Sequence, residues 1–113
     1  MRVNYYIIKK RPDRFGKVMI YFSMYVKQER LRLFTGLRVD PGNWNNKTNQ
    51  VGKEEPGHED INDILRSMEN EARDIWLQYR LSFKKYPSFQ YMKDNLSFVK
   101  KSGNGFLNVT LNK

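Results

Sequence analysis

The sequence contains no cysteine, only one histidine and four prolines, and only three acidic residues in its first 53 positions. Without cysteine, neither disulfides nor thiolate metal sites can form. No apolar run reaches the roughly 18 residues that a membrane-spanning helix needs, and no signal-peptide pattern is present. These absences predict a soluble, cytoplasmic protein without a membrane partner.

Residues that could carry catalysis are also scarce. The single histidine, His58, stands beside acidic residues just before a helical pattern, and it has no obvious partner for a role as general base or metal ligand. Acidic residues gather between positions 54 and 63 without the spacing of an EF-hand, which favours charge at a helix entry over a cation site. No glycine-rich phosphate loop or nucleophile–base pair is found. We therefore expect no catalysis, no metal, no cofactor and no small-molecule substrate.

The distribution of charge is more informative than its total. Residues 1–53 hold 12 Lys and Arg against 3 Asp and Glu, whereas residues 54–113 hold 9 of each, so the whole surplus of nine lies in the first half. A chain of 113 residues fits one modest core. A one-sided basic surface indicates a polyanion as partner, with a basic domain that binds no polyanion as the alternative.

Three segments rich in aromatic and β-branched residues predict strands, at residues 2–10, 18–26 and 31–39. Residues 11–17 and 27–30 are polar and read as turns. Connections this short favour an antiparallel meander, because a parallel crossover needs about a dozen residues or more.

The second hairpin can be read in register if Val26 lies opposite Leu31. Paired positions then place Val18, Ile20, Phe22 and Met24 on one apolar face. The opposite face carries most of the basic and several of the aromatic side chains, with Lys27 opposite Arg30, Tyr25 opposite Arg32, Ser23 opposite Phe34, Tyr21 opposite Gly36 and Met19 opposite Arg38. The first strand is compatible with either orientation, with Val3, Tyr5 and Ile7 or with Tyr6 and Ile8 facing inward.

A long helix is predicted from about residue 59 to about residue 85, where its single apolar stripe can cover the sheet. Residues 88–99 read as a short helix with Ser88 as its cap, residues 100–105 as a flexible turn, and residues 106–113 are weakly patterned. The predicted fold class is α+β: a three-stranded antiparallel sheet packed against one long C-terminal helix, followed by a short helical tail.

The polar face of the sheet and the basic residues beside it are the candidate site. Arginine can read guanine edges in the major groove, and lysine and tyrosine can hold phosphates. An ordinary polar sheet face and a stacking surface for single strands are the alternatives. The candidate DNA-binding residues are Lys10, Arg11, Lys17, Tyr21, Tyr25, Lys27, Arg30, Arg32, Phe34, Arg38 and Lys47.

Trp44 lies in TGLRVDPGNWNNKTNQV, residues 35–51, a segment otherwise built largely of turn residues. Such a loop needs an anchor, and an indole folded over the end of the apolar layer would bury up to about 200 Å². We expect this structural role, with an exposed platform for stacking on a base as the alternative.

The order of these elements, and this segment above all, resembles the N-terminal arm-type DNA-binding domain of tyrosine-recombinase integrases from bacterial mobile elements. The resemblance covers about residues 3–97, and PSFQYMKDN resembles the start of that family's core-binding domain. It implies that residues 1–86 form the arm-type domain and residues 87–113 a linker and a truncated core-binding domain. It also implies that the sheet binds double-stranded DNA at arm sites, repeats that flank the crossover point, with other integrase copies as further partners.

The family's catalytic Arg, His and Tyr constellation has no match here, so we expect no recombination by this chain alone. A protein-interaction module is the alternative function, since the end of the long helix carries Trp76, Tyr79, Leu81 and Phe83. RNA binding is a third hypothesis.

Overall fold

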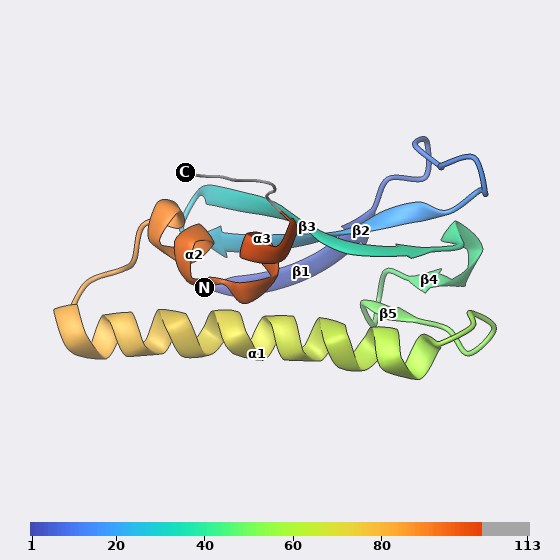
Figure 1. Ribbon diagram of the computed structural model, residues 1–113. Helices are drawn as coiled ribbons and strands as arrows, with labels where there is room; N and C mark the ends of the chain where they lie inside the picture. Colours follow the sequence, from blue (N-terminus) through green and yellow to red (C-terminus); the bar gives the residue numbers. More distant parts are fainter. Residues whose placement is uncertain (103–113) are drawn as a thin grey trace. The chain divides into compact units, whose positions relative to one another are not determined.

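The computed structural model describes residues 1–102, with side chains described to residue 99 (Figure 1). The fold is α+β, with a three-stranded antiparallel sheet, one long helix and a short helical tail, as predicted. The chain forms two compact units, Met1–Leu65 and Arg66–Lys113, and the long helix α1 (His58–Phe83) runs through both. Each unit is described below by itself.

The sheet consists of β1 (Arg2–Ile7), β2 (Val18–Val26) and β3 (Glu29–Val39), with β2 in the middle. The predicted bounds of the second strand are confirmed. The first strand ends at Ile7 instead of residue 10, and the third begins at Glu29 instead of Leu31. The turn between β2 and β3 is therefore only Lys27 and Gln28, and Lys27 adopts a φ of 55° to close it.

The predicted register of β2 and β3 is right at one end and wrong by two residues at the other. Val18 faces Val39 as expected, but Val26 faces Glu29 instead of Leu31. The shift occurs in a bulge in which Thr35, Gly36 and Leu37 lie opposite Ile20 alone. Because side chains alternate with a period of two, a shift of two leaves every side chain on its predicted face.

Thr35 and Gly36 make this bulge possible. Gly36 has a φ of +80°, a conformation that side chains with a Cβ rarely adopt. The buried Thr35 hydroxyl donates to the Ile20 carbonyl at 2.7 Å and accepts from the Leu37 N–H at 3.1 Å. A side chain thus satisfies two backbone groups at the point where the regular ladder is interrupted.

The inner face of the sheet carries the core of the first unit. Its fully buried members come mainly from the central strand: Val18, Ile20, Phe22, Met24 and Val39. The two possibilities for the first strand are resolved, because Val3, Tyr5 and Ile7 pair with inner positions of β2. The Tyr5 hydroxyl donates to the carbonyl of buried Leu65, which fastens the start of α1 to this strand.

A small hairpin, not predicted from the sequence, follows the sheet. It comprises the 3₁₀ turn η1 (Pro41–Asn43), β4 (Trp44–Asn45) and β5 (Gln50–Val51). The Asn49 side chain accepts from the Tyr5 N–H at 2.8 Å, and the Asn62 side chain makes two hydrogen bonds to the backbone of Val51. Amide side chains therefore join this hairpin to the edge strand β1 and to α1.

The second unit contains most of α1 and two short helices, α2 (Phe89–Asn95) and α3 (Ser97–Ser102). The predicted cap is confirmed, since the Ser88 hydroxyl accepts from the Tyr91 N–H. The single helix predicted over 88–99 is wrong, because Leu96 adopts an extended conformation and separates two helices. Residues 100–102, predicted as turn, belong to α3, and the predictions for residues 103–113 lie outside the described residues.

Aromatic contacts and a carboxylate organise the second unit. The Trp76 ring stacks on Tyr86 with centroids 5.2 Å apart, and Tyr79 contacts Tyr91 at 4.6 Å. The Glu71 carboxylate accepts hydrogen bonds from both the N–H and the hydroxyl of Ser97 at 2.9 Å. It therefore stabilises the first residue of α3. The helix α1 ends near the predicted position, where Lys84 takes a φ of 58°.

Thr35→Val tests the role of the bulge. Valine has nearly the same shape but leaves the Ile20 carbonyl and the Leu37 N–H without their partner, so we expect a loss of about 1–3 kcal/mol in the free energy of unfolding. Denaturant unfolding measures it. Thr48→Val is the matched control, because Thr48 is exposed and its hydroxyl bonds to no described residue. Equal stability of the two variants would contradict the role of Thr35.

Candidate nucleic-acid interface

The face of the sheet opposite the core, here called the outer face, is defined by the strand register. Its non-glycine residues alternate along each strand with the residues that face the core. No carboxylate occupies any of these positions. The outer face comprises Arg2, Asn4 and Tyr6 of β1, Met19, Tyr21, Ser23 and Tyr25 of β2, and Arg30, Arg32, Phe34 and Arg38 of β3.

A row of aromatic rings crosses the outer face from one edge strand to the other. Tyr6 lies opposite Tyr21, and Tyr21 lies opposite Phe34. The rings of Tyr6 and Tyr21 are stacked at 5.2 Å, and those of Tyr21 and Phe34 are tilted at 5.6 Å. Cross-strand aromatic pairs of this kind stabilise a sheet and hold the rings in fixed positions.

Arg30 is held beside this row by aromatic groups. Its guanidinium donates to the Tyr25 hydroxyl at 3.2 Å and lies 5.8 Å from the ring centroids of both Tyr6 and Tyr25. The guanidinium of Arg2 lies over the ring of Tyr25, 4.7 Å from the ring centroid. The hydrogen bond from Arg30 lowers the pKa of Tyr25, and the same bond raises the pKa of Arg30. The partners of both guanidinium groups are uncharged tyrosine side chains, so these contacts add no opposing charge.

The other two arginines of the outer face differ in their surroundings. Arg32 is exposed and makes no hydrogen bond, ion pair or ring contact with a described residue. Arg38 lies 3.7 Å from the Asp13 carboxylate, and both side chains are partly exposed. Arg32 therefore offers the guanidinium most available to an added ligand, and Arg38 also helps to position the loop that contains Asp13.

The loop between β1 and β2 lies beside Arg38 and is ordered by Asp13. The carboxylate of Asp13 accepts from the N–H groups of Phe15 and Lys17 at 2.8 and 3.0 Å. The bond from Lys17 N–H is the main reason that the pKa of Asp13 is lowered. Two predicted site residues, Lys10 and Arg11, are exposed on this loop. The loop thus extends the basic surface past the strands.

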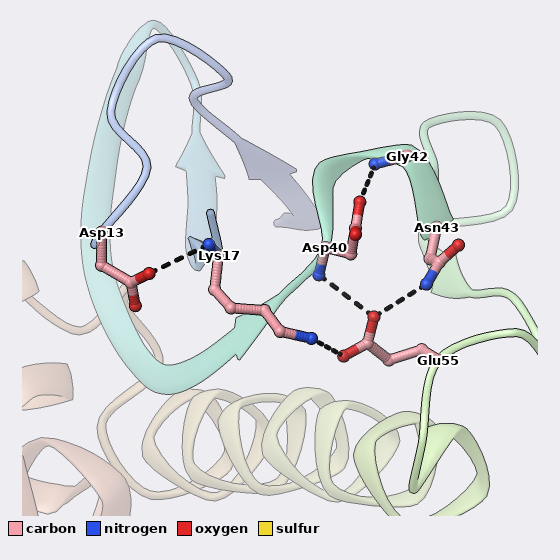
Figure 2. Close-up of polar contacts among 6 residues, drawn as sticks. All are labelled: Asp13, Lys17, Asp40, Gly42, Asn43 and Glu55. Atoms are coloured by element: carbon pink, nitrogen blue, oxygen red, sulfur yellow. Dashed lines mark hydrogen bonds and ion pairs between the residues drawn. The ribbon is translucent and has the colours of Figure 1, made fainter. Parts of the chain in front are cut away.

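Lys17, also predicted as a DNA contact, has its ammonium group on Glu55, 2.8 Å away (Figure 2). Glu55 is only 4% exposed and also accepts from the Asp40 N–H and the Asn43 side chain. Burial raises the pKa of Glu55, but these hydrogen bonds outweigh it, so the pKa is lowered overall. The bond to Glu55 raises the pKa of Lys17. The pair joins three loops, which gives Lys17 a structural role.

The remaining predicted residues lie on turns. Lys27 is exposed between β2 and β3, and Lys47 is exposed between β4 and β5. Trp44 is half-buried: its backbone pairs with Val51, its indole N–H donates to Asn46 at 2.8 Å, and its ring lines a shallow depression with Lys47. Trp44 therefore stabilises the small hairpin. Its half-buried state lies between the buried anchor and the exposed stacking platform that the sequence allowed.

The structure brings six predicted residues together on the outer face: Tyr21, Tyr25, Arg30, Arg32, Phe34 and Arg38. Arg2 and Tyr6, which are not among the predicted residues, complete this surface from β1. Their signal was the alternation of Arg2, Asn4 and Tyr6 with Val3, Tyr5 and Ile7. This alternation assigns Arg2 and Tyr6 to the outer face only when it is known that Val3, Tyr5 and Ile7 face the core.

Among the described residues, no cluster of three or more His, Cys, Asp or Glu could hold a metal ion. No helix in residues 1–102 combines the length and the apolar character that crossing a bilayer requires.

The sequence model of the Arm DNA-binding domain family matches residues 5–93. The chain belongs to this family. No curated protein and no solved structure matches the chain significantly.

Arm DNA-binding domains of this type are the N-terminal domains of tyrosine-recombinase integrases, and they bind DNA without carrying out catalysis. The match confirms the resemblance found in the sequence. It includes the sheet from Tyr5 onward, the small hairpin, all of α1 and part of α2.

The Glu55 network of this Arm DNA-binding domain gives a prediction for stability against pH. Because the pKa of Glu55 in the folded state lies below its ordinary value of 4.5, its stabilisation is complete above that value and is lost as the pH falls through the folded-state pKa. We expect Glu55→Gln to lower the free energy of unfolding by about 1–3 kcal/mol at neutral pH. The difference from the wild type should shrink below pH 4.5.

Denaturant unfolding at a series of pH values measures this difference. Glu54→Gln is the matched control, since Glu54 is exposed and bonds to no described residue. A wild-type advantage over Glu55→Gln that stayed constant through the acid range would show that the carboxylate charge is not what stabilises the three loops.

Proposed function

We propose that the outer face of the sheet enters the major groove of duplex DNA and positions an integrase on arm sites. The observation that carries this proposal is the composition of the outer face: four arginines and a row of aromatic rings, without a carboxylate. Family membership supports DNA as the ligand. The register supports this face as the surface, because the opposite one forms the buried core.

The size of the sheet suits this role. Strands lie about 4.8 Å apart, so three strands span about 10 Å. The major groove of B-DNA is about 12 Å wide and accepts a small sheet. In this arrangement Arg32 and Arg30 point toward base edges, where an arginine can bond to guanine O6 and N7.

Basic residues outside the strands extend the proposed contact to phosphates. Lys10 and Arg11 lie on the loop beside Arg38, Lys27 lies on the hairpin turn, and Lys47 lies on the β4–β5 turn. Cations around a groove-binding element fix its register on the backbone without reading sequence. Lys17 contributes to this surface mainly by holding the loops in place through Glu55.

Arm-site binding also has implications for the location of the chain and for its partners. Arm-site binding would place the chain in the cytoplasm with the DNA, alongside other integrase copies on neighbouring sites. The assignment of residues 1–86 to the arm-type domain, with residues 87–113 as linker and start of a core-binding domain, remains a prediction of the same proposal.

Protein interaction and RNA binding are the two alternative functions, and each predicts a different experimental result. A protein-interaction module would use α1, where Leu77, Leu81 and Phe83 are exposed. Trp76 and Tyr79 are less suited to that role than the sequence suggested, because they contact Tyr86 and Tyr91 within their own unit. Light scattering at increasing concentration tests self-association, and competition between duplex RNA and duplex DNA tests RNA binding.

Arg32→Gln tests the proposed interface. Removing a guanidinium that reads a base should weaken binding to the preferred duplex by about 1–3 kcal/mol and relax specificity at that base. Arg38→Gln should give a similar loss, with an added effect through Asp13. For the wild type, the logarithm of the affinity should fall with the logarithm of the salt concentration, with a slope of about −0.9 for each phosphate neutralised.

Fluorescence anisotropy with a labelled duplex at several salt concentrations measures these effects. Arg73→Gln is the matched control: it makes the same change of charge at an exposed residue of α1, paired with Glu69 at 2.8 Å. If Arg32→Gln and Arg38→Gln both bound as tightly as Arg73→Gln, the outer face would not be the DNA-binding surface.

A further inference from the structure

Phe34 is an exception on the outer face. It is 60% exposed on the edge strand β3, and it is the only large, wholly apolar side chain on that face with such exposure. Its neighbours on the same face of β3 include Arg32, and its partner across the strands is Tyr21. A phenyl ring held in water among cations leaves much of its apolar area unburied, so a ligand that covers it would gain free energy.

The ring of Phe34 is placed by neighbouring aromatic side chains. Phe34 contacts Tyr21 at 5.6 Å, and Tyr21 stacks on Tyr6 at 5.2 Å, so two further rings support it from one side. In the part of the chain that the structure describes, β3 pairs only with β2, so the opposite side of Phe34 lies at the edge of the sheet. The exposed part of the ring therefore offers an apolar surface beside the guanidinium of Arg32.

The chemistry of the major groove limits what this contact can meet. The base edges there present hydrogen-bond donors and acceptors, and the one apolar group among them is the C5-methyl of thymine. A phosphate or a sugar hydroxyl would leave the phenyl ring without a suitable partner. A thymine methyl would bury both apolar surfaces at once.

We propose that Phe34 reads the C5-methyl group of a thymine in the DNA site. This inference rests on the proposed function, because it requires the outer face to lie in the major groove. It assigns Phe34 as a specificity-determining residue. The arginines then select guanine by hydrogen bonds, whereas Phe34 selects thymine by apolar contact.

Uracil substitution tests this inference without changing the protein. A duplex is first enriched from a random-sequence pool by the wild-type chain, and each of its thymines is then replaced in turn by uracil, which lacks only the methyl group. We expect one or two positions at which the replacement weakens wild-type binding about fourfold, the effect of one buried methyl group. Phe34→Ala should bind the thymine and uracil duplexes equally.

Phe15→Ala is the matched control, because Phe15 is 75% exposed but lies on the β1–β2 loop and not on the outer face. It should keep the fourfold preference. A uracil effect that persists in Phe34→Ala, or no effect at any thymine of an enriched duplex, would overturn the assignment of Phe34 while leaving the proposed function intact. Failure of the wild type to bind or enrich any duplex would overturn the proposed function, and the role of Phe34 with it.

Discussion

Side chains alternate between the two faces of a strand, and this alternation separates the core of the protein from its basic surface. The first compact unit depends on keeping that separation along all eleven residues of β3. The bulge at Gly36 shifts the pairing by two residues, which preserves the alternation, whereas a shift of one would place Arg32 in the core. The Thr35 hydroxyl forms hydrogen bonds with backbone groups of Ile20 and Leu37 at this shift, where the ladder is interrupted. The even number of residues in this register shift thus determines which side chains of β3 face solvent.

Polar side chains form hydrogen bonds at an edge of the small sheet and in the loops next to its strands. Asn49 accepts from the open edge of β1, Asn62 pairs with the backbone of Val51, and Glu55 gathers donors from Lys17 and the turn at Asp40. A sheet of three strands has two edges and little area, so its loops need such connections. This explains why a segment rich in asparagine forms a defined hairpin. It also explains why Lys17 serves the scaffold more than the surface.

Patterns with a fixed period made most of the fold predictable. Alternation gave the faces of β2 and β3, the helical stripe gave α1 nearly to the residue, and Ser88 marked the start of α2. The two-residue turn at Lys27 was missed because neither Lys27 nor Gln28 is a usual turn residue, and Lys27 needs a positive φ. The orientation of β1, and with it Arg2 and Tyr6, depended on the Tyr5 hydroxyl reaching Leu65, a contact between residues 60 positions apart. No local pattern encodes such a contact.

The way Arg30 is restrained has a consequence for how fast a polyanion could be captured. An arginine that is held by a carboxylate makes a strong charge-assisted hydrogen bond, which a phosphate must displace. Arg30 is instead fixed by the hydroxyl of Tyr25 and by the faces of two tyrosine rings. These contacts reduce the rotamers open to Arg30 before any encounter, and they bring no opposing charge that would weaken the attraction at a distance. Among the described residues, Arg30 is thus both restrained and unpaired with a carboxylate, unlike Arg38, whose partner is Asp13.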